Sequence, residues 1–221
     1  MLRTSFSLIF QEVYMIKNYP APWNLTGKGY ILLYKFPKVF AEEKANVPEF
    51  LKGKFAGGFG ALMLVDYSTS DAGPYGELLL IPGKFMHEGK KLNTISKIYV
   101  STMASVINGR RNWGIPKELA DFSFQAIDSR TEKVSVTSEE TMVAEFILES
   151  GKLSFPVNTK LLPFPLVQQY EGKYYYTTFH GSGTGRFAKL KDISVNPGLF
   201  PDVSGFRPIA AIKVEPFKIV F

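Results

Sequence analysis

Short segments rich in β-branched and aromatic residues recur along the whole chain, and this recurrence constrains the fold more than any other feature. The segments lie at 28–36, 59–67, 77–81, 92–100, 121–127, 133–137, 142–148, 152–155, 173–179, 186–195 and 209–221. Gly, Pro or Ser residues bound them, so turn signals return after every roughly 8 to 15 residues. This spacing is typical of an antiparallel barrel or sandwich, whereas a doubly wound α/β fold alternates strands with long helices. The sequence therefore predicts a mainly β (α+β) fold with a few short helices.

Two segments favour helices. The first is 38–45 and the second is 101–108. Ser101 or Thr102 is suited to cap the start of the second helix, and Gly109 stands just past its expected end.

The chain is expected to form one domain over residues 15–221, because it shows neither an internal repeat nor a linker. Residues 1–14 are interpreted as an N-terminal extension, either disordered or an artefact of an upstream start, since Met15 opens a stretch that resembles a natural start. The Pro-rich segment 162–166 is expected to cross between two sheets.

Composition excludes several classes of function. The chain has 221 residues, no cysteine and two histidines, which excludes disulfide scaffolds, thiolate nucleophiles and zinc sites built on cysteine or on three histidines of one chain. The net charge of +6 is spread along the sequence without a basic cluster, so we expect no nucleic-acid partner. No apolar segment approaches the roughly 20 residues of a membrane span, and no export signal is visible, so the expected location is cytoplasmic.

Three other features favour ordinary structural interpretations. The glycine-rich segment 181–186 is expected to form a hairpin turn rather than a phosphate-binding loop, because the residues that follow it alternate like a strand. His180 is interpreted as a turn residue, and His87 as part of a polar loop. Tyr174 and Tyr176 are expected to pack on one face of a strand.

The segment 109–122, with sequence GRRNWGIPKELADF, resists such an interpretation. Gly114 permits backbone angles closed to other residues, and Pro116 fixes its own φ, so the segment fixes a bend and aims Lys117. If the Lys117 amine is desolvated, its pKa falls and it becomes a nucleophile. The alternative is that Lys117 extends into solvent and only Trp113 is buried.

This segment resembles the signature of the acetoacetate decarboxylase family, Gly-Arg-Glu-x-Trp-Gly-φ-Pro-Lys, where φ is apolar or aromatic. The resemblance implies that Lys117 forms a Schiff base with a β-keto acid. GPYGE at 73–77 resembles the family's Tyr-x-Glu segment, which implies that Glu77 is an active-site carboxylate. GKGYILLYKF at 27–36 resembles its first core strand, and Lys28 stands where the family has an arginine that lines the cavity.

The family resemblance also implies a fold and a substrate. The expected fold is a closed, conical, antiparallel β-barrel around an apolar cavity, and the expected substrate is a small keto acid. Lys117 and Glu77 are expected to be catalytic, and Lys28, Tyr99, Trp113 and Ile115 to bind the substrate. The family chemistry needs no metal and no cofactor, and its members commonly form homo-oligomers.

Two positions depart from the family signature. Glu118 stands where the well-known decarboxylases have a second lysine, and by charge alone it would raise the pKa of Lys117. Arg111 stands where the signature has glutamate, so Arg111 and Glu118 are interpreted as neighbours that modulate this pKa and can pair with each other. Activation of Lys117 would then have to come from desolvation.

The expected reaction is decarboxylation of a 3-oxo acid to a ketone and CO2. Two alternatives stay open at this point. The same fold can run imine-based aldol or dehydration chemistry, or it can bind a small apolar ketone or carboxylate without catalysis.

Overall fold

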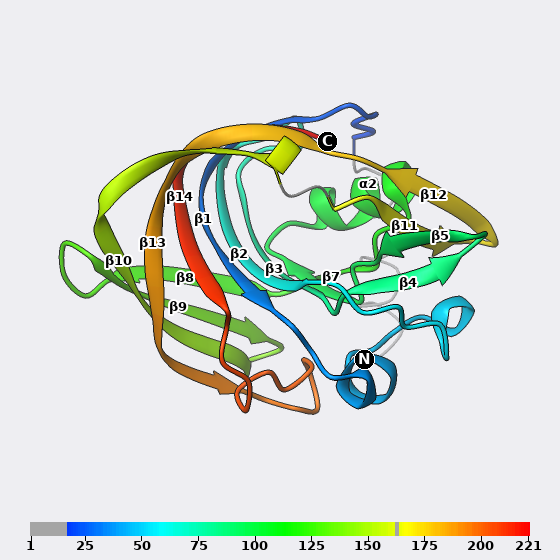
Figure 1. The fold of residues 1–221 in the computed structure, drawn as a ribbon. Coiled ribbons are helices and arrows are strands. Elements are labelled where there is room, and N and C mark those ends of the chain that lie inside the picture. Colours follow the sequence, from blue (N-terminus) through cyan, green and yellow to red (C-terminus); the bar gives the residue numbers. More distant parts are fainter. Residues whose placement is uncertain (1–16, 162–163) are drawn as a thin grey trace, which may run out of the picture.

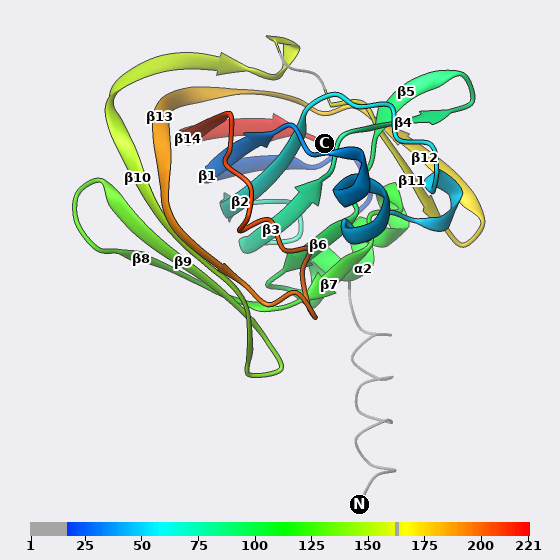
Figure 2. The ribbon, with the colours of Figure 1, turned by 60° about the horizontal axis from the view of Figure 1, so that its bottom comes forward.

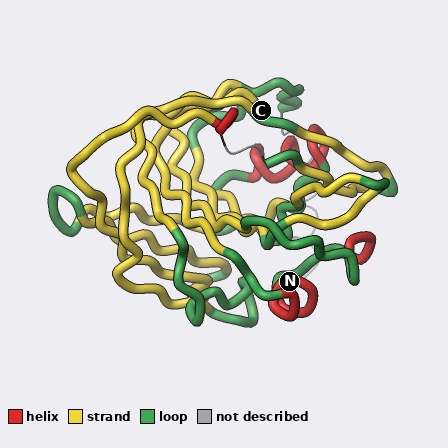
Figure 3. The backbone as a smooth tube through the Cα atoms, viewed as in Figure 1, coloured by secondary structure: helices red, strands yellow, loops and turns green. Residues whose placement is uncertain are grey.

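The computed structural model describes residues 17–161 and 164–221, and this part of the chain is mainly β (Figure 1, Figure 3). The strands are β1 (Asn24–Tyr34), β2 (Gly60–Thr69), β3 (Tyr75–Ile81), β4 (Lys84–His87), β5 (Lys90–Asn93), β6 (Lys97–Val100), β7 (Lys117–Leu119), β8 (Asp121–Ala126), β9 (Thr131–Ser138), β10 (Thr141–Asn158), β11 (Leu166–Tyr170), β12 (Lys173–Thr177), β13 (His180–Val195) and β14 (Ala210–Val220). The helical elements are the π-helical turn η1 (Phe40–Lys44), the 3₁₀ turns η2 (Glu49–Leu51) and η3 (Thr159–Leu161), and the α-helix α2 (Met103–Trp113).

Ten strands form one strongly curved sheet in the order β7-β6-β3-β2-β1-β14-β13-β10-β9-β8. Its two edge strands, β7 and β8, follow each other in the chain and are joined by Ala120, whose N–H donates to the Val100 carbonyl at 3.0 Å. The covalent connection between the edges bends the sheet into a nearly closed barrel, with β8 and β9 curling beneath the sheet toward β7 (Figure 2). The predicted mainly β barrel is confirmed. A smaller sheet, β12-β11-β5-β4, lies beside α2.

Strict alternation along the central strands gives the large sheet two different faces. On β3, Leu78 and Leu80 point to a core that also contains Phe146 of β10; we call this the core face. Glu77 and Leu79 point to the opposite side, which we call the cavity face. A residue's place in this alternation therefore decides whether it reaches the site described below.

Several predicted strands have different bounds in the structure. The segment 92–100 is broken into β5 and β6, and the segments 142–148 and 152–155 form the single long strand β10. The predicted hairpin turn at 181–186 is wrong, because these residues continue β13 and pair with both β10 and β14. Gly183 fits there because a Cβ would lie 2.6 Å from the Pro216 carbonyl oxygen.

The predicted helix at 101–108 forms, but it ends later than expected. Thr102 is the cap, and its hydroxyl accepts a hydrogen bond from the Ser105 N–H at 3.3 Å. The helix continues through Gly109 and ends at Trp113, where the C-cap residue Gly114 adopts a left-handed conformation with φ of 65°. Because tertiary contacts bury Gly109 in the helix interior, it does not act as the stop signal.

Both histidines lie in structural contexts other than those predicted from the sequence. His87 is buried at the end of β4, and its Nε2 lies 3.1 Å from the Tyr176 hydroxyl. The rings of Phe50 and Tyr174 pack around it, which explains why a residue from a polar sequence context is not in an open loop. His180 is the first residue of β13 rather than a turn residue.

Two predictions from the sequence concern residues outside the described ranges. Residues 1–14 lie outside the described residues, and so does part of the crossing predicted at 162–166. Within the described ranges, no helix combines the length and the apolar character that a bilayer crossing requires.

The core face supplies a direct test of the packing. Phe146→Ala removes a fully buried ring and is expected to lower the free energy of unfolding by about 3–5 kcal/mol. Leu153→Ala, at a side chain that is 84% exposed on the same strand, is the control and should change it by less than about 0.5 kcal/mol. Urea denaturation measures both values, and equal effects would contradict the described packing.

Candidate active site

Lys117 is the first residue of β7, and its side chain is buried with only 4% exposed. β7 runs parallel to β6, with Lys117 opposite Ile98, so alternation sends the Lys117 side chain to the cavity face. The alternative in which Lys117 extends into solvent is therefore wrong. Glu118, the next residue, points the other way.

The bend predicted from the sequence holds the backbone of Lys117. After Gly114 ends the helix, the Lys117 N–H donates to the Ile115 carbonyl at 2.8 Å. Arg110, in the last turn of α2, donates from Nε and Nη2 to the Lys117 carbonyl at 3.0 and 2.6 Å. Donation from two atoms of one planar guanidinium fixes both the position and the orientation of that peptide.

Gly109 leaves the space through which the Lys117 side chain reaches the site. A Cβ at this position would lie 2.7 Å from Cδ and 2.9 Å from Cε of Lys117. Glycine in the middle of a helix costs about 1 kcal/mol relative to alanine. Close passage of the lysine chain accounts for a glycine at this place in α2.

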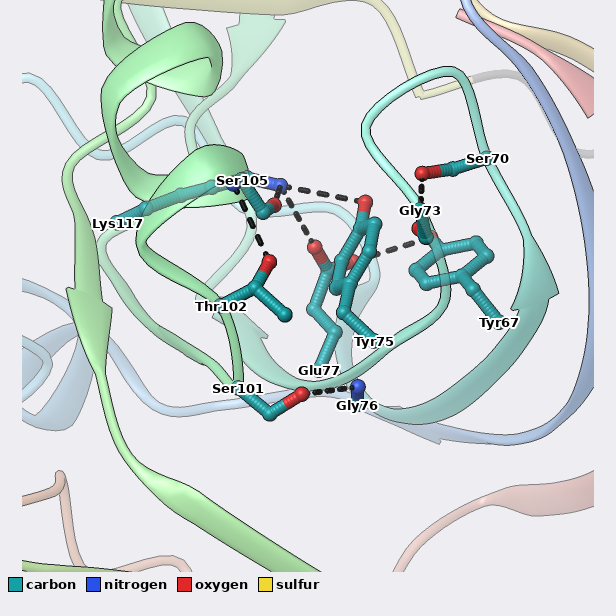
Figure 4. A network of polar contacts seen from close by, with 10 residues as sticks. All are labelled: Tyr67, Ser70, Gly73, Tyr75, Gly76, Glu77, Ser101, Thr102, Ser105 and Lys117. Atoms are coloured by element: carbon teal, nitrogen blue, oxygen red, sulfur yellow. Dashed lines mark hydrogen bonds and ion pairs between the residues drawn. The ribbon is translucent and has the colours of Figure 1, made fainter. Parts of the chain in front are cut away.

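Polar atoms from two elements, β3 and α2, surround the Lys117 amine (Figure 4). Its Nζ donates to Glu77 Oε2 at 3.0 Å and to Ser105 Oγ at 3.0 Å, and lies 3.4 Å from the Tyr75 hydroxyl. The Tyr67 hydroxyl donates to the other carboxylate oxygen of Glu77 at 3.1 Å. Glu77 is thus held from both sides, and one of its oxygens is directed at the amine.

The charge state of Lys117 differs from the sequence expectation. Burial lowers the pKa of Lys117, but the Glu77 carboxylate and the Tyr75 hydroxyl raise it, and the net direction is upward from 10.5. Desolvation alone therefore does not activate this amine, because it is buried together with an anion. Burial also raises the pKa of Tyr75, to about 12, and that of Tyr67, so both hydroxyls stay protonated near neutral pH.

The amine opens into an apolar pocket of about 350 Å³. Trp113 and Ile115, both predicted to bind substrate, line this pocket together with Lys117 and Glu77. Trp113 is held edge-on between Trp23 and Phe221, with ring centroids 4.9 Å from each. The structure thus brings four of the predicted site residues together around one small cavity.

Two predicted substrate-binding residues are not brought to the site, because they stand on the core face. Lys28 of β1 donates to Glu132 at 2.6 Å and lies 3.8 Å from Asp66, away from Lys117. Tyr99 of β6 packs into the core, and its hydroxyl donates to the Leu199 carbonyl at 3.0 Å. Strand alternation sends these two side chains to the side of the sheet opposite the Lys117 amine, and their role in substrate binding stays a prediction.

The two departures from the family signature also lie away from the amine. Glu118 accepts a hydrogen bond from Lys97 at 2.7 Å, so it does not form the expected pair with Arg111. Arg111 is exposed on α2. The carboxylate that raises the pKa of Lys117 is Glu77 rather than its sequence neighbour Glu118.

Sequence reasoning missed three polar residues of the site: Tyr67, Tyr75 and Ser105. Tyr75 stands two residues before Glu77 on a strand, so the period of two was a usable signal. Tyr67 comes opposite Tyr75 only through the β2–β3 register, and Ser105 only through the packing of α2. Within the described residues, no three acidic or histidine side chains gather as a metal site would require.

The Lys117–Glu77 contact predicts a pH dependence for the reactivity of the amine. Glu77→Gln removes the anion that raises the pKa of Lys117 and leaves the lowering effect of burial. The midpoint for acylation of Lys117 by acetic anhydride, followed by mass spectrometry across pH, should then lie at a lower pH than in the wild type.

Glu118→Gln is the matched control for this measurement, since Glu118 pairs with Lys97 instead. Its midpoint should equal that of the wild type. A downward shift in Glu118→Gln, or none in Glu77→Gln, would contradict the assignment of Glu77 as the partner of the amine.

Gly109 allows a second test. Glycine to alanine inside a helix ordinarily stabilises a protein by about 1 kcal/mol, but in Gly109→Ala the new methyl group presses on the Lys117 chain. We expect this gain to be absent in urea denaturation, and the acylation rate of Lys117 to change. Arg111→Ala, on the exposed side of α2, should alter neither quantity appreciably. A stabilisation of about 1 kcal/mol together with an unchanged acylation rate would contradict the close approach of the Lys117 side chain to Gly109.

Comparison with solved structures places this arrangement among known folds. A structure described as "Structural Studies of Acetoacetate Decarboxylase" matches with a TM-score of 0.66 and 13% identity, over 92% of this chain and 88% of that one. Acetoacetate decarboxylase from Legionella pneumophila subsp. pneumophila matches with a TM-score of 0.60 and 13% identity, over 97% and 92%. The enduracididine biosynthesis enzyme MppR complexed with pyruvate matches with a TM-score of 0.64 and 14% identity, over 91% and 88%. At such low identity these likenesses show a shared fold.

The sequence also resembles a curated protein and a described family. "Protein NEOXANTHIN-DEFICIENT 1" from Oryza sativa subsp. japonica is 29% identical over 120 residues, which are 53% of this chain and 39% of the rice protein. The match therefore spans well under half of that relative. The sequence model of the family "Acetoacetate decarboxylase (ADC)" matches residues 33–186, which are more than half of the chain and include both Glu77 and Lys117. The chain belongs to the acetoacetate decarboxylase family.

Proposed function

We propose that this protein is a Schiff-base-forming lyase that decarboxylates a 3-oxo carboxylic acid through Lys117. The observation that carries the proposal is a buried amine 3.0 Å from a carboxylate and 3.0 Å from a hydroxyl, at the edge of an apolar pocket. A nucleophilic lysine needs a nearby group that takes its proton and returns it. Glu77 is at hydrogen-bond distance for this task.

The first step is a proton transfer, since the raised pKa of Lys117 means that the resting amine is charged. Nζ gives its proton to Glu77 Oε2, which leaves a neutral amine and a neutral acid. The amine attacks the ketone carbon, and the nitrogen proton moves to the new alkoxide to give a carbinolamine. Glu77 then returns its proton to the carbinolamine hydroxyl, water leaves, and a protonated imine remains on Lys117.

The imine is the electron sink for decarboxylation. The bond between the α-carbon and the carboxylate breaks, CO2 leaves, and its bonding electrons neutralise the iminium as an enamine. A proton added at carbon and attack by water on the resulting iminium then release the ketone and the free lysine. The apolar surroundings favour the central step, because the carboxylate is less stable there than neutral CO2.

The hydroxyls around the amine support this sequence. Tyr67 donates to Glu77 Oε1, so only Oε2 is left to exchange protons with Lys117. Ser105 and Tyr75 remain protonated donors that can hold the oxygen of the ketone or of the carbinolamine. These roles need no metal and no organic cofactor.

A second candidate is imine-based aldol or dehydration chemistry. The described residues that line the two pockets of the cavity face include no arginine and no lysine besides Lys117. A substrate without a carboxylate would need no such cation. A solved structure of MppR is described as complexed with the condensation product of pyruvate and imidazole 4-carboxaldehyde, so carbonyl condensation products are bound within this fold.

Borohydride trapping tests the proposal. Incubation with acetoacetate and borohydride should leave a reduced adduct on Lys117, located by peptide mass spectrometry, and CO2 should be released when the reductant is omitted. In Lys117→Met the adduct should be absent and CO2 release should fall by at least about a thousandfold, because the covalent intermediate cannot form.

Lys173→Met, at an exposed lysine of β12, is the control and should match the wild type in both measurements. An adduct without CO2 release would favour the aldol or dehydration candidate. Absence of any adduct with acetoacetate, acetylacetone and longer ketones would reject imine chemistry and favour a non-catalytic binder.

A further inference from the structure

A second, larger cavity adjoins the pocket of the amine. The two share Tyr67, Glu77, Leu79, Ile95 and Phe221 among their lining residues, so they meet at the carboxylate. The larger cavity has about 800 Å³ of empty space when it is counted out to its open mouth. The pocket of the amine measures about 350 Å³ on the same basis, so the larger cavity offers more than twice the space that lies beside Lys117.

The walls of this cavity are almost entirely apolar. Aliphatic and aromatic side chains come from the cavity face of the large sheet and from the segments that cover it: Ile31, Met63, Val65, Leu79, Ile81, Val157, Leu166, Phe179, Val214, Phe217, Ile219 and Phe221. Among the described lining residues, the only carboxylate or cationic side chain is Glu77, which stands at the junction with the amine. A charged substituent would find no further ionic partner among these described residues, whose other polar side chains are the hydroxyl-bearing Tyr30, Tyr67, Thr159 and Ser182.

We propose that the substrate carries a long apolar tail, which lies in this cavity while its carbonyl group meets Lys117. This inference rests on the proposed function for its reactive end and names the substrate class: a 3-oxo acid, or the ketone released from it, with an extended hydrocarbon chain. The chemistry of the walls supports the assignment, since most of the surface that they offer is apolar and its removal from water is favourable.

The geometry gives the two ends of the substrate different tasks. At one end, Glu77 and Ser105 surround the amine and set the position of the carbonyl carbon. Away from the amine, Met63, Val157 and Val214 line the larger cavity and do not line the pocket of the amine. A tail between these ends lies against β1, β2 and β3 and excludes water from the side of the amine that faces the cavity.

A series of methyl ketones of increasing length tests this inference. Acetone, 2-heptanone and 2-undecanone differ in the apolar chain alone, and their affinities can be measured by calorimetry with wild type and with Lys117→Met. Each methylene that enters the cavity should tighten binding about fourfold, so the dissociation constant should fall steeply along the series in both proteins. Equal affinities for all three ketones in both proteins would overturn the inference.

A bulky substitution in the cavity sharpens the test. Met63 lines the larger cavity and not the pocket of the amine, so Met63→Trp should fill tail space and flatten the chain-length dependence. Met142→Trp is the matched control at an exposed methionine of β10, and it should keep the wild-type dependence. A steep dependence that persists in Met63→Trp would place the tail elsewhere and contradict the proposal.

The two proposals fail in distinguishable ways. Chain-length-dependent binding without a reducible adduct on Lys117 would reject the imine chemistry and leave the tail site standing. An adduct that forms equally well with acetone and 2-undecanone, together with flat affinities, would reject the tail site and leave the imine chemistry standing.

Discussion

The contact between the Lys117 amine and the Glu77 carboxylate is the interaction on which the rest of the site depends. Each of these charged groups is almost fully buried, and removing one charge from water costs several kcal/mol unless a partner and further hydrogen bonds compensate. The fold supplies that compensation from separate elements: Tyr67 from β2 and Ser105 from α2. The large sheet and the helix therefore have to be in place before the charged pair is stable, which links the chemistry of the site to completion of the fold.

Strand alternation divides the charged residues of the sheet into two separate systems. Lys28, Asp66 and Glu132 interact on the core face, while Lys117 and Glu77 interact on the cavity face. A shift of one residue in the pairing of β7 with β6 would send Glu118 rather than Lys117 to the amine's position. Arg110 opposes such a shift, because its guanidinium holds the Lys117 carbonyl with two donors.

Local sequence patterns predicted the strand-rich fold and a helix capped by Ser101 or Thr102, of which Thr102 is the cap. Lys117 and Glu77 were predicted from the resemblance of two segments to a family signature, since the local pattern alone left Lys117 free to extend into solvent. The motif around Trp113 and Lys117 carries its own geometry in Gly114 and Pro116, which is why it could be interpreted without coordinates. The position of Lys28 could not be predicted from a motif match, because its face depends on register across the sheet. The direction of the Lys117 pKa required the distance to Glu77, which is a contact between residues 40 apart in the chain.

The pairing of an ionised amine with a large apolar cavity has a consequence for how the site responds to a ligand. When no ligand fills the cavity, solvent that enters it can reach only the exposed 4% of the Lys117 side chain and 6% of the Glu77 side chain. An apolar tail that fills the cavity removes this water, and the neutral pair formed by proton transfer then loses less solvation than the ionised pair does. We therefore expect tail binding to favour the neutral amine at the moment when a carbonyl group lies beside it. The apolar walls would then favour transfer of a proton from the Lys117 amine, and the buried carboxylate of Glu77 would receive that proton.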